Sequence, residues 1–170
     1  TSQASQEARS LRSGFLESFA SQPDAIAVEV AGESLRYADL HDRAARLGAT
    51  LDREDVRSDG EDRPRLTAVF GQRSTAVVAG ILGALFRGDG YVPLNPTFPV
   101  ERTRSMLERS GCRAIVLDEH GLKQIVEVLE GVDTPLVLIA PEEEDLESLR
   151  DALPLHRVLG PSDLCLLYTS

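Results

Sequence analysis

Short apolar runs alternate with segments of helical periodicity along most of this sequence, and this alternation constrains the fold more than any other feature. Strand-length runs occupy residues 66–70, 91–94, 114–117, 136–139 and 164–168. Helical patterns occupy residues 75–86, 99–110 and 122–129, and a further helix is expected from the acidic run at residue 142 to residue 150. Such alternation predicts an α/β fold in which right-handed crossovers place helices over a mostly parallel sheet.

The first 65 residues have a different pattern. Residues 11–19 and 38–51 carry apolar side chains at helical spacing, and residues 26–30 and 34–37 read as two strands joined at Gly32-Glu33. An N-terminal hairpin is therefore expected before the sheet. Residues 54–65 are charge-rich and are predicted to form an exposed loop. The many small residues of the 75–86 helix imply that another element packs closely against it.

Charge and composition exclude several functional classes. The 170 residues carry a formal net charge of -10, with 42% hydrophobic and 27% charged residues. This balance fits one globular domain, and the negative field disfavours nucleic acid and anionic membranes as partners. No apolar run reaches the roughly 20 residues that a membrane crossing needs. The start lacks a secretory signal, which predicts a cytoplasmic location.

No set of residues points to a metal or a catalytic centre. His41, His120 and His156 lack the spacing of a metal site, and Cys112 and Cys165 are expected to be reduced. The acidic run at residues 142–145 is expected to begin a helix with its carboxylates pointing outward. The sequence therefore predicts no catalytic residue and no metal ligand.

One segment is far more specific than the rest. Residues 85–102 read LFRGDGYVPLNPTFPVER, and residues 35–40 read LRYADL. These segments resemble the second and first core motifs of nonribosomal peptide synthetase adenylation domains, which are adenylate-forming enzymes. Residues 23–28 and 73–85 are also similar to that family. The chain departs from the usual motifs at Arg36, where Ser or Thr is usual, and at Asn95, where Asp is usual.

The resemblance implies specific roles for a few residues. Tyr168, Thr169 and Ser170 resemble the opening of the third core motif, whose Gly-rich continuation with a Lys holds the ATP phosphates. Thr169 and Ser170 are therefore the predicted cofactor-binding residues. Tyr37 and the prolines of the second motif are expected to be structural, with Tyr37 packing on the core and the prolines fixing the chain as it leaves a strand.

The resemblance also implies what the parent enzyme does. It would use ATP and Mg2+ to convert an amino acid to an aminoacyl adenylate, and a carrier-protein thiol would then accept the acyl group. The chain has no starting Met and ends within an apolar stretch. We therefore expect residues 1–170 to be a partial AMP-binding domain, its N-terminal subdomain, without the phosphate loop, the substrate pocket or the C-terminal lid. Such a piece is expected to be inactive alone.

Three alternatives remain open from the sequence. The parent could be an acyl-CoA ligase or an aryl-acid ligase of the same superfamily, although the run at residues 91–96 favours the peptide-synthetase branch. The chain could instead be a non-catalytic α/β interaction domain with an acidic surface. A small flavodoxin-like domain would explain the alternation of strands and helices but not the motifs.

Overall fold

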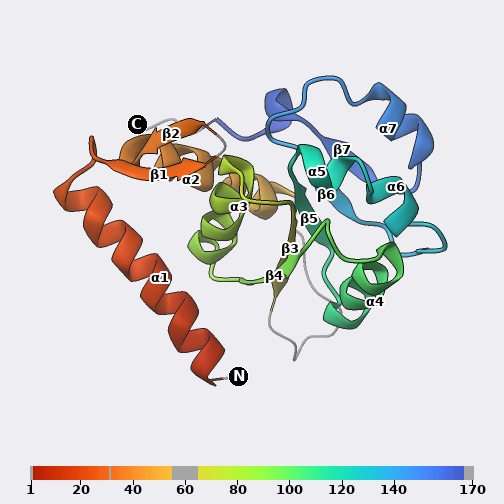
Figure 1. Ribbon diagram of the computed structural model, residues 1–170, viewed down its shortest axis with the longest axis horizontal. Helices are drawn as coiled ribbons and strands as arrows, with labels where there is room; N and C mark the ends of the chain where they lie inside the picture. The colour runs from red at the N-terminus through yellow and green to blue at the C-terminus, as the bar shows by residue number, and fades with distance from the viewer. Residues whose placement is uncertain (1, 31, 55–64, 167–170) are drawn as a thin grey trace.

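The N-terminal part of the computed structural model contains a long helix and a hairpin (Figure 1). The structure describes residues 2–30, 32–54 and 65–166, with side chains described from Leu11 onward. Helix α1 (Ser2–Ser21) is followed by β1 (Ile26–Val30) and β2 (Glu33–Arg36), which pair antiparallel. Helix α2 (Tyr37–Arg53) comes next. The predicted hairpin is thus confirmed, whereas residues 55–64 of the predicted loop lie outside the described residues.

Within the described residues, five parallel strands form the main sheet in the order β4-β3-β5-β6-β7. Their bounds are β3 (Leu66–Phe70), β4 (Gly90–Leu94), β5 (Ala114–Leu117), β6 (Val137–Ile139) and β7 (Arg157–Leu159). The helices that follow are α3 (Thr75–Phe86), α4 (Val100–Ser110), α5 (Glu119–Leu122), α6 (Ile125–Val128) and α7 (Glu147–Ala152), with a 3-10 turn, η1 (Pro161–Asp163). The predicted α/β class with a mostly parallel sheet is confirmed.

Helices cover both faces of this sheet, and each face has its own core (Figure 1). Ile115 and Leu117 of β5 point into a cluster with residues of α4 and α6. Their neighbours Ala114 and Val116 point into a second cluster with α2 and α3. Because successive strand residues face opposite ways, a strand buried on both sides must be apolar throughout. All four residues of β5 are buried apolar side chains, as this arrangement requires.

Helices α2 and α3 pack backbone against backbone at two glycines. A Cβ atom on Gly83 would lie 3.0 Å from the carbonyl oxygen of Ala44 and 3.0 Å from the Cβ of Leu47. A Cβ atom on Gly48 would lie 3.0 Å from the carbonyl oxygen of Gly83. On another side of α3, Gly80 faces Val116 of β5 at the same distance. The close neighbour predicted for the small residues of α3 is therefore α2 on one side and the sheet on the other.

The second half of the chain corrects three predictions. The predicted 122–129 helix is two short helices, α5 and α6. The helix expected from residue 142 begins at Glu147, because the preceding acidic residues form a turn in which Glu143 Oε1 accepts the Asp145 amide at 3.1 Å. Local bonds of this kind compete with helix formation.

The last strand also lies elsewhere than predicted. The structure has β7 at Arg157–Leu159. This strand has only three residues, two of them apolar, so its sequence shows no recognisable strand pattern. Residues 164–166 of the expected 164–168 strand are not in a strand, because the backbone groups of Cys165 bond to side chains of α2 instead. Residues 167 and 168 lie outside the described part. No helix in the described part is long and apolar enough to cross a membrane.

Candidate functional site

The carboxyl ends of β3 and β5 are the place where this fold would bind a ligand. From β3 the chain crosses to β4 through α3, on one side of the sheet, whereas from β5 it continues toward β6 through α5 and α6 on the opposite face. Ligands of open parallel sheets bind outside the carboxyl ends of the strands at such a switch point. The side chains along this edge therefore form the candidate site.

Asp118 is the central residue of the edge and follows directly after β5. Its side chain is 4% exposed and accepts four hydrogen bonds. Oδ2 accepts from the Gln72 amide and the Ser74 hydroxyl, both at 2.8 Å. Oδ1 accepts from the amides of His120 and Gly121, both at 2.9 Å, which makes Asp118 the N-cap of α5. One carboxylate thus joins the loop after β3 to the helix after β5.

Two glycines allow these loops to approach each other. A Cβ on Gly121 would overlap the carbonyl oxygen of Phe70, and a Cβ on Gly71 would overlap the carboxylate of Asp118. Only a residue without a side chain fits at either place. The loop also contains Arg73, which has a positive φ of 39° although it is not a glycine, and the turn it makes leads into the N-cap Ser74 of α3.

A second set of contacts continues the edge toward β6. Thr75, the first residue of α3, donates its hydroxyl to Glu142 Oε1 at 2.8 Å, and Glu142 follows closely after β6. Arg43 of α2 lies 3.3 Å from Glu33 and 4.0 Å from Glu142. Both Asp118 and Glu142 therefore bond to the first residues of α3, where the positive end of the helix dipole favours negative charge.

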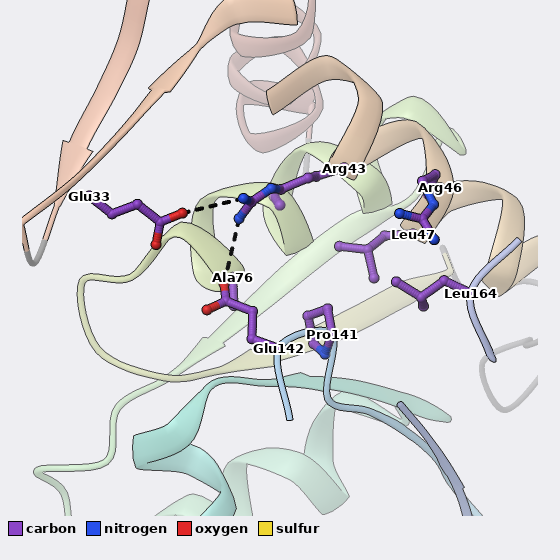
Figure 2. A pocket seen from close by; sticks show the side chains of 9 residues that line it. Glu33, Arg43, Arg46, Leu47, Ala76, Pro141, Glu142 and Leu164 are labelled. Atoms are coloured by element: carbon purple, nitrogen blue, oxygen red, sulfur yellow. Dashed lines mark ion pairs between the residues drawn. The ribbon is translucent and has the colours of Figure 1, made fainter. Parts of the chain in front are cut away.

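A pocket of about 250 Å³ adjoins this edge (Figure 2). Figure 2 shows Glu33 and Glu142 on either side of Arg43, with ion pairs to both, while Arg46, Leu47 and Leu164 lie at the other end. The remaining lining residues are Ala76, Ala79 and Pro141. The pocket thus has two acids and two guanidinium groups around an apolar floor.

Carboxylate side chains occupy the beginning of α3. The beginning of α3 already bonds two carboxylates, which would repel a phosphate. In the ranges 2–30, 32–54 and 65–166, no group of three or more His, Cys, Asp or Glu side chains could hold a metal ion. The predicted cofactor residues Thr169 and Ser170 lie outside the described residues, so their prediction is untested.

Three titratable groups whose pKa values are shifted mainly by burial lie away from this edge. Burial raises the pKa of Asp89, although the nearby guanidinium groups of Arg87 and Arg65 act in the opposite direction. Asp89 precedes β4, at the amino end of the sheet, with Arg65 at 3.0 Å. Burial also raises the pKa of the Cys112 thiol and lowers the pKa of His156. None of these three groups faces the candidate site.

The motif residues serve the framework, as predicted. Gly88 has a φ of 89° and ends α3, and Pro93 lies in β4, which is an edge strand where a missing amide is tolerated. Pro99 is the N-cap of α4. Asn95 Oδ1 accepts from the amide and the hydroxyl of Thr97 at 2.9 and 2.8 Å, so the amide oxygen does what a carboxylate oxygen could do there.

Sequence reasoning did not find Asp118 or the contacts of Glu142. A signal for Asp118 exists, since an acid directly after a buried strand marks the carboxyl edge of a parallel sheet. Glu142 was assigned to an outward-facing helix start, and this was wrong because it lies in a turn and bonds to Thr75. His41 stacks on Phe19, with ring centroids 4.1 Å apart.

Comparison with known proteins identifies related sequences. The family model described as AMP-binding enzyme matches residues 15–170. Tyrocidine synthase 3 of Brevibacillus parabrevis is 33% identical over 163 residues, which are 95% of this chain and 2% of that protein. Surfactin synthase subunit 1 of Bacillus subtilis is 34% identical over 143 residues, covering 83% of this chain and 4% of that protein. The chain therefore spans a small fraction of the relatives it matches.

Solved structures agree with this result. The crystal structure of IdnL7 superposes with a TM-score of 0.68 at 31% identity, over 80% of this chain and 25% of that chain. The Vibrio cholerae adenylation domain AlmE, solved in complex with glycyl-adenosine-5'-phosphate, gives a TM-score of 0.76 at 23% identity. That likeness covers 89% of this chain and 28% of the other, and it shows a shared fold.

Proposed function

The chain belongs to the AMP-binding enzyme family, and from that premise we propose that it forms the N-terminal part of an adenylation domain that activates an amino acid. The observation that carries the proposal is the similarity to a peptide synthetase, tyrocidine synthase 3, along 95% of the chain. The second core motif supports it, because its residues occupy the end of α3, strand β4 and the start of α4, with Gly88 at a positive φ that suits a glycine.

In the proposed reaction an amino-acid carboxylate and ATP give an aminoacyl adenylate and pyrophosphate. A carrier-protein thiol would then take the acyl group and release AMP. ATP and Mg2+ are the proposed cofactors, and Thr169 and Ser170 are the proposed start of the phosphate loop. In this proposal the described residues supply the framework of the domain, and the groups that react come from further sequence.

The proposal also concerns what residues 1–170 would lack. The rest of the phosphate loop, the substrate pocket and the lid of such a domain would come from further sequence. We therefore propose that the 170-residue chain has no activity alone and that catalysis belongs to the natural protein that carries it. A cytoplasmic location is part of the same proposal.

The test is substrate-dependent exchange of pyrophosphate into ATP by the natural protein that carries this chain. Three pools of substrates are compared: the proteinogenic amino acids, aryl acids and fatty acids. We expect exchange with at least one amino acid and none above background with the other pools. Exchange with an aryl or fatty acid alone would instead identify a ligase of the other branch, and no exchange with any pool would contradict the enzyme proposal.

A parallel assay uses residues 1–170 alone under the same conditions. We expect no exchange above a no-enzyme blank with any of the three pools. Substrate-dependent exchange by this chain would contradict the proposed division of the domain.

A further inference from the structure

The segment 164–166 lies against helix α2 and is fixed there by two side chains one helical turn apart. The backbone amide of Cys165 donates to Thr50 Oγ1 at 2.9 Å. The backbone carbonyl of Cys165 accepts from Arg46 Nε at 3.1 Å. The Thr50 hydroxyl itself donates to the Arg46 carbonyl oxygen at 2.7 Å. Helix α2 thus satisfies both backbone groups of one residue, as a neighbouring strand would.

The surroundings make this contact firm. Thr50 is fully buried at 0% exposed, and Leu164 is buried at 9% in the core cluster that includes Leu47. Leu164 has extended dihedral angles, with φ -72° and ψ 145°. Figure 2 shows Leu164 beside Arg46 and Leu47 at one end of the pocket. The bond from the Cys165 amide is part-buried, and its acceptor, Thr50, has no access to water, so losing this bond has a cost.

The position of this contact in the sequence gives it a consequence. Cys165 stands three residues before Tyr168, where the predicted third core motif begins. Three residues can extend by at most about 10 Å, at roughly 3.3 Å per residue. The fixed backbone of Cys165 is therefore close, along the chain, to the predicted start of that motif.

Resting on the proposed function, we infer that Arg46 and Thr50 are positioning residues that align the chain entering the phosphate-binding loop. Neither needs to touch a reacting atom, since each acts through the backbone of Cys165. The geometry that carries the inference lies wholly in residues 46–50 and 164–166.

The first test measures the contact itself by amide hydrogen exchange in the natural protein without nucleotide. Thr50→Val keeps the shape of the side chain but removes the hydroxyl. We expect amides of the peptide covering residues 164–170 to exchange about tenfold faster, whereas Thr50→Ser should restore slow exchange. The matched control is Thr103→Val, because Thr103 is also 0% exposed and its hydroxyl has no hydrogen-bond partner in the described part. Unchanged exchange in Thr50→Val would overturn the inference.

The second test measures steady-state kinetics of the same variants. We expect Thr50→Val to raise KM for ATP about tenfold while KM for the amino acid stays within twofold, with Thr50→Ser and Thr103→Val close to the unaltered protein. A general loss of folding would lower kcat without this split. If Thr50→Val does not fold, Arg46→Met gives the same test, since it keeps a side chain that reaches the ε position but removes the Nε donor to the carbonyl of Cys165.

The outcomes separate the two proposals. An unaltered protein that exchanges no pyrophosphate would overturn the proposed function. An active Thr50→Val variant with unchanged KM for ATP would overturn the positioning role alone. A raised KM for ATP in both Thr50→Val and Arg46→Met, with Thr103→Val unaffected, would support it.

Discussion

Removing the buried carboxylate of Asp118 should destabilise the carboxyl edge of the sheet more than removing any exposed acid. In Asp118→Ala, the N-cap of α5 is lost, which costs about 1 to 2 kcal/mol. The Gln72 amide and the Ser74 hydroxyl also lose their acceptor, at about 1 kcal/mol each, since both can partly return to water. We expect the free energy of unfolding to fall by about 3 to 4 kcal/mol.

Asp118→Asn separates these contributions. The side-chain oxygen of Asn can still accept from the amides of His120 and Gly121, because Asn is as good an N-cap as Asp. Its NH2 group then faces the Ser74 hydroxyl, which can rotate to accept, and the Gln72 amide, which cannot. The expected loss is therefore about 1 kcal/mol, close to one hydrogen bond.

Urea unfolding followed by circular dichroism measures both losses. Asp39→Ala is the matched control, because Asp39 is an exposed acid near the start of α2 that accepts one long bond, at 3.4 Å, from the Arg36 amide. That change should cost within about 0.5 kcal/mol. If Asp118→Ala costs no more than Asp39→Ala, or if Asn is as damaging as Ala, the account of Asp118 as the residue that joins the two loops is wrong.

Three further predictions concern other parts of the chain. Gly83→Ala should lower the free energy of unfolding by about 1 to 2 kcal/mol, because the new Cβ would press against α2. Gly14→Ala should raise it by about 0.5 to 1 kcal/mol, because a Cβ there meets nothing within 4 Å. If urea unfolding shows that both variants are stabilised equally, the close packing of α2 and α3 is contradicted. Because burial raises the pKa of Asp89, its contribution to stability is greatest below its ordinary pKa of 3.8 and is lost as pH rises through the raised value. The free energy of unfolding of Asp89→Asn, measured against pH, should therefore lack this pH-dependent part. If its pH dependence equals that of the unaltered protein, the raised pKa of Asp89 is contradicted. Thiol reagents at neutral pH should modify Cys165 before Cys112, because Cys112 is 3% exposed and burial raises the pKa of its thiol. Mass spectrometry gives the order of modification, and the reverse order would contradict the burial of Cys112.

Much of the fold could be predicted because local pattern and tertiary structure agree in its central part. Strand β5 is a continuous apolar run and β3 is apolar except for Thr67, so both are suited to burial on two faces, and α3 carries its small residues where α2 and β5 approach it. In these segments each local preference supports the same tertiary arrangement.

The errors come from segments where local signals are weak or compete. Strand β7 has three residues and joins the sheet only through its neighbour β6, so its pairing is a tertiary effect. The acidic run at residues 142–145 was given to a helix because acids favour helix starts, but these side chains bond to nearby amides and to Thr75 instead. Residues 164–166 have the composition of a strand, yet α2 side chains bind the backbone of Cys165.

The candidate site was harder to predict than the fold. Asp118 bonds to Gln72 and Ser74, which lie more than 40 residues away in sequence, and no periodic pattern reports such a contact. The family motifs located the framework but not this edge. The predicted cofactor residues Thr169 and Ser170 remain predictions, since they rest on the resemblance alone.

The most direct test of the central claim is to identify the product that the natural protein carrying this chain makes from ATP. The protein is incubated with ATP, Mg2+ and a mixed pool of amino acids, aryl acids and fatty acids, and the acyl adenylates are identified by mass spectrometry. The account predicts an aminoacyl adenylate whose formation depends on both ATP and the amino acid. An adenylate formed only from an aryl or fatty acid, or no adenylate at all, would contradict it.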